Sequence, residues 1–166
     1  MNKRTSLVFT LLQIAAVLIA LVGTVAAAFL GSIGVESFFF FLEIQNHAYA
    51  AYAVIGLITV VVVSVFSYGA LYHFFSLCQR LKSETAFTPA NEKGMHRIAV
   101  CCGVCGAALL AALVLGFVLV NGFALFFVEL LLLLSAAYLC IGLAAYALEL
   151  LLCRATAIQQ ENDLTI

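Results

Sequence analysis

The sequence predicts an all-α membrane protein with four transmembrane helices, arranged as two antiparallel hairpins with both termini in the cytoplasm. The 166-residue chain is 66% hydrophobic and only 9% charged, whereas soluble domains are about 45–50% apolar. It contains four uncharged stretches, each near or above the roughly 20 residues that a helix needs to cross a bilayer. All seven Lys and Arg residues fall before the first stretch, between the second and third, or after the fourth. Because basic residues stay on the cytoplasmic side, this pattern predicts the orientation.

The predicted spans make up a single domain over residues 1–166 and follow the uncharged stretches, at about 6–30, 50–77, 98–120 and 124–152. The first span has a longer apolar run than the roughly 7–15 residues of a signal-peptide core, so we expect an uncleaved helix. An external loop over 31–49 would join it to the second span. This loop contains Phe38 to Phe41, which we interpret as a short interfacial helix; the alternative is a lid over a pocket between helices.

A cytoplasmic hinge over 78–97 leads to the third span. Thr88 and Pro89 suit the N-cap and first helical positions, so we expect this helix to begin near Pro89. The Asn121-Gly122 pair suits the reversal into the fourth span, because both residues tolerate the positive φ of a sharp turn. That turn brings Glu149 level with Lys93 and Arg97, where an ion pair is expected.

Small residues on the third helix predict that it is the centre of the packing, since small side chains let helices approach closely in lipid. Two stripes recur at a spacing of four residues, and small residues of the fourth helix are expected to lie opposite them: Gly103, Ala107 and Ala111; Ala108, Ala112 and Gly116; and Ala136, Ala137 and Ala144. These stripes serve equally well inside one chain or between chains, so a homo-oligomer remains open.

Three polar residues within the spans, Glu129, Gln13 and His73, form a candidate intramembrane polar site. An ionisable residue in a bilayer is by default a functional hypothesis. If the three converge on a cavity, the chain is a small transporter or channel subunit. The simpler interpretation is that they form hydrogen bonds between helices or lie at the interface. We expect no metal and no cofactor, because His73 has no second ligand at helical spacing.

The pair Cys102 and Cys105 forms a C-x-x-C sequence, which opens a second alternative, a membrane thiol or redox protein. Five of the six cysteines would lie near the cytoplasmic side, which is reducing. Reactive thiols also need an accessible, electropositive setting. We therefore favour a role as small apolar packing residues. No catalytic template is present in the sequence, so we expect no enzyme activity.

The hinge and the cytoplasmic tail, 153–166, carry the most distinctive polar residues. We interpret them either as topology anchors or as a docking surface for a cytosolic partner. The candidate docking residues are Arg80, Lys82, Phe87, Thr88, Asn91, Lys93, Arg97, Glu161, Asp163, Leu164 and Ile166.

Together, Arg80-Leu81-Lys82, Phe87-Thr88-Pro89, Asn91, Arg97-Ile98 and the terminal residues 161–166 resemble a bacterial membrane family known as domain of unknown function 2975. The resemblance implies a four-helix protein of the inner membrane without an established activity. Genes of this family often neighbour a helix-turn-helix regulator of the Cro/repressor type. The resemblance thus implies a membrane protein that holds or informs such a cytosolic regulator, and it supplies no catalytic residues. We expect the chain to be non-enzymatic and not to bind nucleic acid directly.

Overall fold

The structure, a computed structural model, describes residues 3–82, 89–120 and 125–163, and this part of the chain is helical except at residues 44–46 and 120. It contains α1 (Lys3–Glu43), α2 (His47–Lys82), α3 (Pro89–Leu119) and α4 (Leu125–Asp163). Each of the four helices is long and apolar enough to cross a membrane. The predicted fold class, an all-α protein with four transmembrane helices, is confirmed, and the chain is a multi-pass membrane protein.

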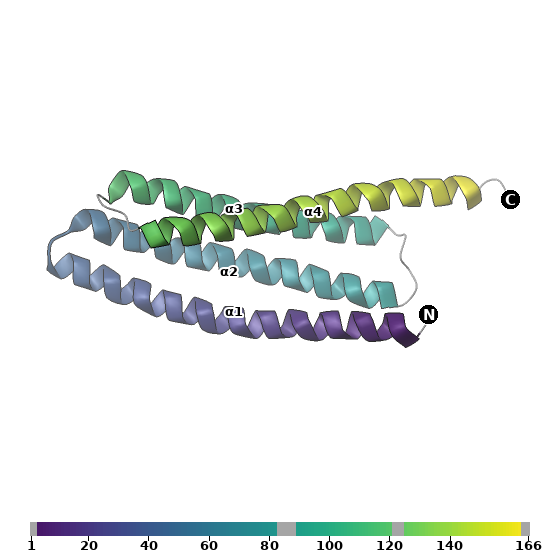
Figure 1. Cartoon of the computed structure of the whole chain (residues 1–166), viewed down its shortest axis with the longest axis horizontal. Coiled ribbons are helices and arrows are strands. Elements are labelled where there is room, and N and C mark those ends of the chain that lie inside the picture. Colours follow the sequence, from purple (N-terminus) through teal and green to yellow (C-terminus); the bar gives the residue numbers. More distant parts are fainter. Residues whose placement is uncertain (1–2, 83–88, 121–124, 164–166) are drawn as a thin grey trace.

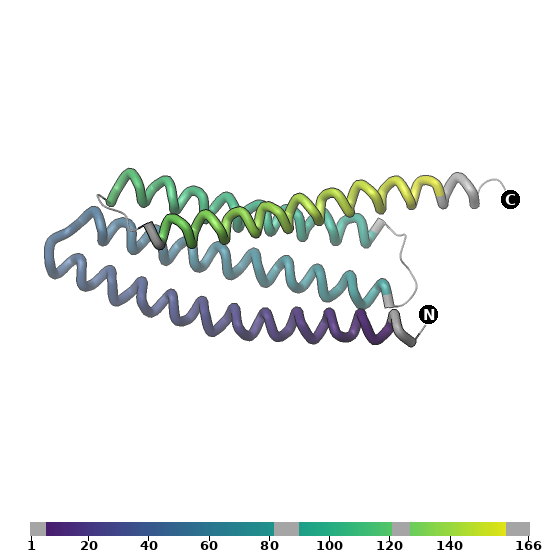
Figure 2. The backbone as a smooth tube through the Cα atoms, in the orientation of Figure 1, coloured from purple at the N-terminus to yellow at the C-terminus, as the bar shows by residue number. Residues whose placement is uncertain are grey.

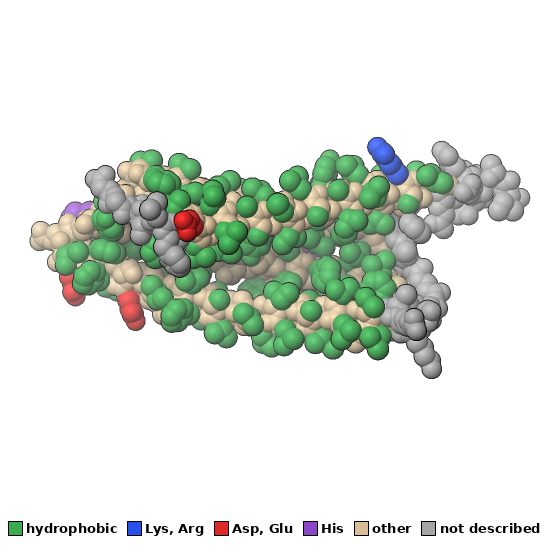
Figure 3. All heavy atoms as spheres, in the orientation of Figure 1, with side chains coloured by type: hydrophobic (Ala, Val, Ile, Leu, Met, Phe, Trp, Pro, Cys, Tyr) green, Lys and Arg blue, Asp and Glu red, His purple; other side chains and the backbone are tan. Residues whose placement is uncertain are grey.

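Consecutive helices run in opposite directions, so the start of α1, the end of α2, the start of α3 and the end of α4 lie toward one end of the molecule (Figure 1). We call this the basic end, after Arg80, Lys93, Arg97 and Arg154. The α1–α2 connection lies at the other end. The face shown in Figure 3 is covered along its length by hydrophobic side chains, as expected of a surface in contact with lipid. Which end faces the cytoplasm, and the division into two hairpins, stay predictions.

Helix α3 is the centre of the packing, as predicted. Among the described residues, backbones approach closely only between α1 and α2, α2 and α3, and α3 and α4. Half of the buried apolar side chains of the described residues belong to α3, whereas α1 contributes only Ala16. Helix α1 is attached along α2, in part by a hydrogen bond of 2.6 Å between the hydroxyls of Thr24 and Tyr68.

Side chains of α4 also reach α2 across α3. The hydroxyls of Ser67 on α2 and Tyr138 on α4 are 2.7 Å apart. The thiol of Cys105, which is 0% exposed, lies 3.7 Å from the same Ser67 oxygen. This polar cluster joins three helices at one level.

Contacts between α3 and α4 include two glycines that were not predicted. A methyl group at Gly106 would lie 2.8 Å from Leu139, and one at Gly142 would lie 3.3 Å from the Ala99 carbonyl. At Gly103 a methyl group would meet nothing within 4 Å. Of the predicted stripes, the one containing Ala112 faces the protein, whereas the other members of the Gly103 stripe are exposed, as are the three alanines expected opposite on α4.

The level at which α3 and α4 pair agrees with the expected register to within two residues. The hydroxyl of Ser135 donates to the Gly106 carbonyl at 3.2 Å. Glu149 pairs with His96, at 3.1 Å, instead of with Lys93 or Arg97. The level was correct and the partner was wrong, because Lys93 and Arg97 lie on the face of α3 that is turned to α2.

Residues 31–43 continue α1 as one helix, so the expected external loop and separate interfacial helix are wrong. No proline interrupts this segment, and the helix reaches 41 residues, about 60 Å at 1.5 Å per residue. The helix ends where Gln45 adopts a φ of 55° and the amides of Gln45 and Asn46 bond to the carbonyls of Leu42 and Phe41, a Schellman arrangement. The Asn46 side chain then accepts the amide of Tyr49 and caps α2.

The predicted start of α3 agrees with the structure, whereas the predicted end of α4 does not. Helix α3 begins at Pro89, as expected. Helix α4 continues to Asp163, beyond the expected end at 152, and its path carries it past the start of α3 (Figure 2). The Asn121-Gly122 turn lies outside the described residues.

Candidate anion-binding site between α2 and α3

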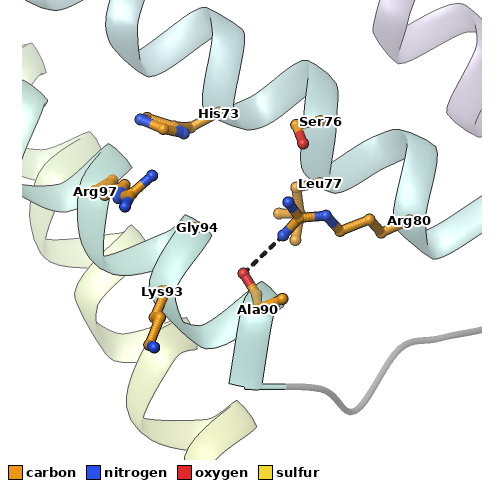
Figure 4. A pocket seen from close by; sticks show the side chains of 8 residues that line it. All are labelled: His73, Ser76, Leu77, Arg80, Ala90, Lys93, Gly94 and Arg97. Atoms are coloured by element: carbon orange, nitrogen blue, oxygen red, sulfur yellow. Dashed lines mark hydrogen bonds between the residues drawn. The ribbon is translucent and has the colours of Figure 1, made fainter.

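A pocket of about 190 Å³ lies between the last turns of α2 and the first turns of α3, at the basic end (Figure 4). Its lining is shared equally between the two helices and consists of His73, Ser76, Leu77, Arg80, Ala90, Lys93, Gly94 and Arg97.

The two helices contribute their lining residues with identical spacing. On each helix the residues stand at positions i, i+3, i+4 and i+7, from His73 to Arg80 on α2 and from Ala90 to Arg97 on α3. Residues at this spacing share one face of a helix. The pocket is therefore made by two facing stripes, and Gly94, where a methyl group would meet nothing within 4 Å, contributes no side chain to fill it.

One hydrogen bond ties the two stripes together. The guanidinium of Arg80 donates to the carbonyl of Ala90 at 2.9 Å, joining the end of α2 to the start of α3 (Figure 4). This bond fixes the direction of the Arg80 side chain, and with it one wall of the pocket.

The polar side chains that line the pocket are all able to donate hydrogen bonds, and none is a carboxylate. Figure 4 shows His73, Arg80 and Arg97 directed toward the space between the helices, with Lys93 extending away from them. Within the part of the chain that the structure describes, no ion pair engages Lys93 or Arg97. Such a lining favours an anion.

Only part of the predicted docking surface can be compared with this site. Arg80, Lys93 and Arg97 meet in the pocket. Asn91 is 0% exposed and belongs to the interior. Lys82, Glu161 and Asp163 lie in the final turns of α2 and α4, while Phe87, Thr88, Leu164 and Ile166 lie outside the described residues.

The structure does not bring the candidate intramembrane residues together. His73 lines the pocket, Gln13 is half-buried on α1, and Glu129 is exposed near the start of α4. From the register of the helices, Glu129 lies about 25 Å from His73 along the bundle, at 1.5 Å per residue. Without a shared cavity, a transport pathway through these three residues has no geometric support.

The cysteines are all free. Cys102 and Cys105 are 4% and 0% exposed, so the C-x-x-C pair is not accessible in the folded chain. Among the described residues, no group of three or more His, Cys, Asp or Glu side chains is placed to hold a metal ion.

Sequence reasoning missed Ser76, and it assigned His73 to a different site. The pocket could have been suspected from the repeated spacing of its lining residues. The stripe that ends at Arg80 and the stripe that ends at Arg97 both follow the pattern i, i+3, i+4 and i+7. Recognising it required knowing that these two faces oppose each other.

No curated protein and no solved structure matches the chain. The family described as "Protein of unknown function (DUF2975)" matches residues 37–166. This region includes the last part of α1, all of α2, α3 and α4, and every residue of the pocket. Because most of the chain is matched, it belongs to the DUF2975 family.

Proposed function

We propose that this chain is a non-enzymatic protein of a bacterial inner membrane, which works by binding an anionic group in the pocket between α2 and α3. The observation that carries the proposal is the composition of the pocket. Three basic side chains, an imidazole and a hydroxyl line it without a carboxylate. Charged donors form hydrogen bonds with anions that are roughly twice as strong as neutral ones.

The position of the pocket supports the same proposal. It lies where the charged end of the molecule meets the apolar spans, since residues 98–128 of the chain contain no Asp, Glu, Lys or Arg. Here a binding event reaches both α2 and α3, the central helix of the bundle. Because the Arg80–Ala90 bond already orders this end, little reorganisation is needed before an anion binds.

Thermal unfolding of the full chain in detergent tests the proposal. Sulfate, phosphate and citrate are compared with chloride at equal ionic strength. We expect a higher Tm with at least one of the multivalent anions, because a ligand that binds only the folded state stabilises it by RT ln(1 + [L]/Kd). The effect should be lost in Arg97→Gln and kept in Arg154→Gln, which removes the same charge from an exposed position of α4.

The matched variant is needed because sulfate and phosphate also stabilise proteins without binding a site. A rise in Tm that is equal in the natural chain, Arg97→Gln and Arg154→Gln would refute the pocket as the binding site. Circular dichroism at low temperature establishes that each variant is folded before the comparison.

A second candidate function is the docking of a cytosolic helix-turn-helix regulator, which would bind the basic end and the end of α4. The observation that favours it is the continuation of α4 as a helix to Asp163, past the start of α3 (Figure 2). This length exceeds what the bilayer needs by several turns, which supports the proposal that the end of α4 extends into water, where a partner can bind it.

Co-purification tests this docking. A helix-turn-helix regulator of the Cro/repressor type, the kind whose genes neighbour this family, is expressed with the full chain, with a chain that ends after Ala157, and with Arg97→Gln. We expect the truncation to abolish retention of the regulator. Equal retention by the truncated and full chains would exclude the end of α4 as the docking surface. A reporter fused to the C-terminus tests the cytoplasmic orientation on which this docking depends.

A further inference from the structure

We infer that the anion bound between α2 and α3 is the phosphate group of a membrane phospholipid, so that the pocket is a site for an anionic lipid headgroup. This inference rests on the proposed function and names its ligand. Four properties of the pocket lead to it: its size, its donors, its level in the membrane and the surface beside it.

The size of the pocket selects a small group. Sites for drug-sized ligands and cofactors occupy about 300–1,000 Å³, whereas this pocket measures about 190 Å³. A nucleotide or a comparable metabolite would not be enclosed. A single phosphate with its nearest ester atoms is a better match, and the rest of a lipid would remain outside the pocket.

The donors suit phosphate oxygens. Guanidinium groups match a phosphate with paired N–H donors and are the preferred side chains for its recognition. Arg80 and Arg97 approach from opposite helices, and His73 faces the same space (Figure 4). Ser76, one turn before Arg80 on the same face, adds a hydroxyl. Glu92 lies in the first turn of α3 but does not line the pocket.

The level of the pocket corresponds to that of lipid phosphates. The uncharged stretch of α2 ends at Gln79 and that of α3 begins at Ile98, so the pocket straddles the boundary between the charged end of the molecule and its apolar spans, where the edge of the hydrocarbon region is expected. Basic pockets between transmembrane helices at this depth bind the headgroups of anionic lipids. A soluble anion would have to compete with headgroups already concentrated at this level.

The surface beside the pocket continues as lipid-facing apolar surface. Tyr72, next to His73, is 70% exposed, and Val100, one turn beyond Arg97, is 49% exposed. Leu77 contributes an apolar part of the lining. When the headgroup occupies the pocket, the acyl chains of the lipid therefore lie beside exposed apolar side chains of α2 and α3. Other lipid covers this surface otherwise, so the exchange does not change the apolar area that is buried.

Lipid selectivity in vesicles tests the inference. The full chain is reconstituted in phosphatidylcholine vesicles with spin-labelled phosphatidylglycerol or spin-labelled phosphatidylcholine, and the immobilised fraction is measured by electron paramagnetic resonance. We expect a preference for phosphatidylglycerol that falls about tenfold in Arg97→Gln, the factor for one hydrogen bond to a charged group. The preference should be unchanged in Arg154→Gln.

A second variant keeps the test decisive if Arg97→Gln does not fold. Ser76→Ala removes a hydroxyl of the lining and no charge, so a reduced preference in this variant cannot come from altered net charge. Arg80→Gln is not used, because it would also break the bond to Ala90.

The outcomes separate the inference from the proposed function. No preference for phosphatidylglycerol, or one that both pocket variants retain in full, overturns the lipid assignment. If inorganic phosphate in detergent still raises the Tm of the natural chain and not that of Arg97→Gln, an anion site exists and its ligand comes from solution. If neither lipid preference nor anion stabilisation depends on Arg97, both proposals fail.

Discussion

Replacing Gly106 by Ala is expected to weaken the α3–α4 interface, although Ala is the better helix former. The added methyl carbon would lie 2.8 Å from Cγ of Leu139 and 2.9 Å from its Cδ2, with the Ser135 carbonyl at 3.4 Å. Carbon atoms pack at about 3.5–4.0 Å, so α4 must move away or Leu139 must leave its position. Movement of α4 would also stretch the hydrogen bond from Ser135 to the Gly106 carbonyl, now 3.2 Å.

Three contributions set the magnitude. Overpacking a tight contact costs about 1–3 kcal/mol. Loss of an interhelical hydrogen bond in a membrane protein costs about 0.6–1.7 kcal/mol. The higher helix propensity of Ala relative to Gly offsets this loss by about 0.8–1 kcal/mol. The net expectation is a decrease of about 1–4 kcal/mol in the free energy of unfolding.

The matched control is Gly103→Ala, one turn away on the same helix. The identical methyl group meets nothing within 4 Å there, so only the propensity gain remains and the chain should become no less stable. Both variants are unfolded by titrating sodium dodecyl sulfate into dodecylmaltoside micelles, with near-ultraviolet circular dichroism of the tyrosines as the signal. If Gly106→Ala proves as stable as Gly103→Ala, the close approach of the two helices at Gly106 is wrong.

Two further predictions concern the buried polar cluster and the thiols. In a double-mutant cycle, Ser67→Ala and Tyr138→Phe should show a coupling of about 0.6–1.7 kcal/mol, because their hydroxyls are 2.7 Å apart; additive effects would contradict the bond. A membrane-impermeant maleimide should label the exposed Cys153 in detergent micelles, while Cys105, 0% exposed, reacts only after unfolding. Mass spectrometry of peptides locates the label, and rapid labelling of Cys105 in the folded chain would contradict its burial.

The elements that could be predicted from the sequence are those with a local cause. Pro89 begins α3, because its fixed φ and missing N–H suit the first position of a helix. The register between α3 and α4 followed from the expectation of a tight turn, and Glu149 was placed at the correct level. The continuation of α1 to Glu43 was not predicted, because four consecutive phenylalanines at 38–41 favoured a separate interfacial helix.

The caps between α1 and α2 illustrate a signal that was present and not used. Asn46 is a favoured N-cap residue, and its side chain accepts the amide of Tyr49. Gln45, in contrast, adopts a φ of 55°. This conformation could not be predicted from the sequence, because Gly or Asn is the usual residue at the left-handed position that follows a helix. Only the packing of α1 on α2 requires the chain to reverse there.

The composition and charge pattern alone determined that this chain crosses a membrane four times, because a continuous apolar helix is a property of the sequence itself. Which faces of the helices meet was decided only by the tertiary structure. In a soluble helix the polar side marks the exposed face, but lipid is as apolar as a protein interior, so these helices carry apolar residues all round.

The pocket between α2 and α3 is the clearest example of a feature that the sequence indicates only in part and the tertiary structure decides. Arg80 and Arg97 were identifiable as residues of the basic end, and His73 as a polar residue within a span. That His73 and both arginines line one space depends on the rotation of α2 and α3 about their axes. Packing between the two helices sets that rotation, which therefore cannot be predicted from any local pattern in the sequence.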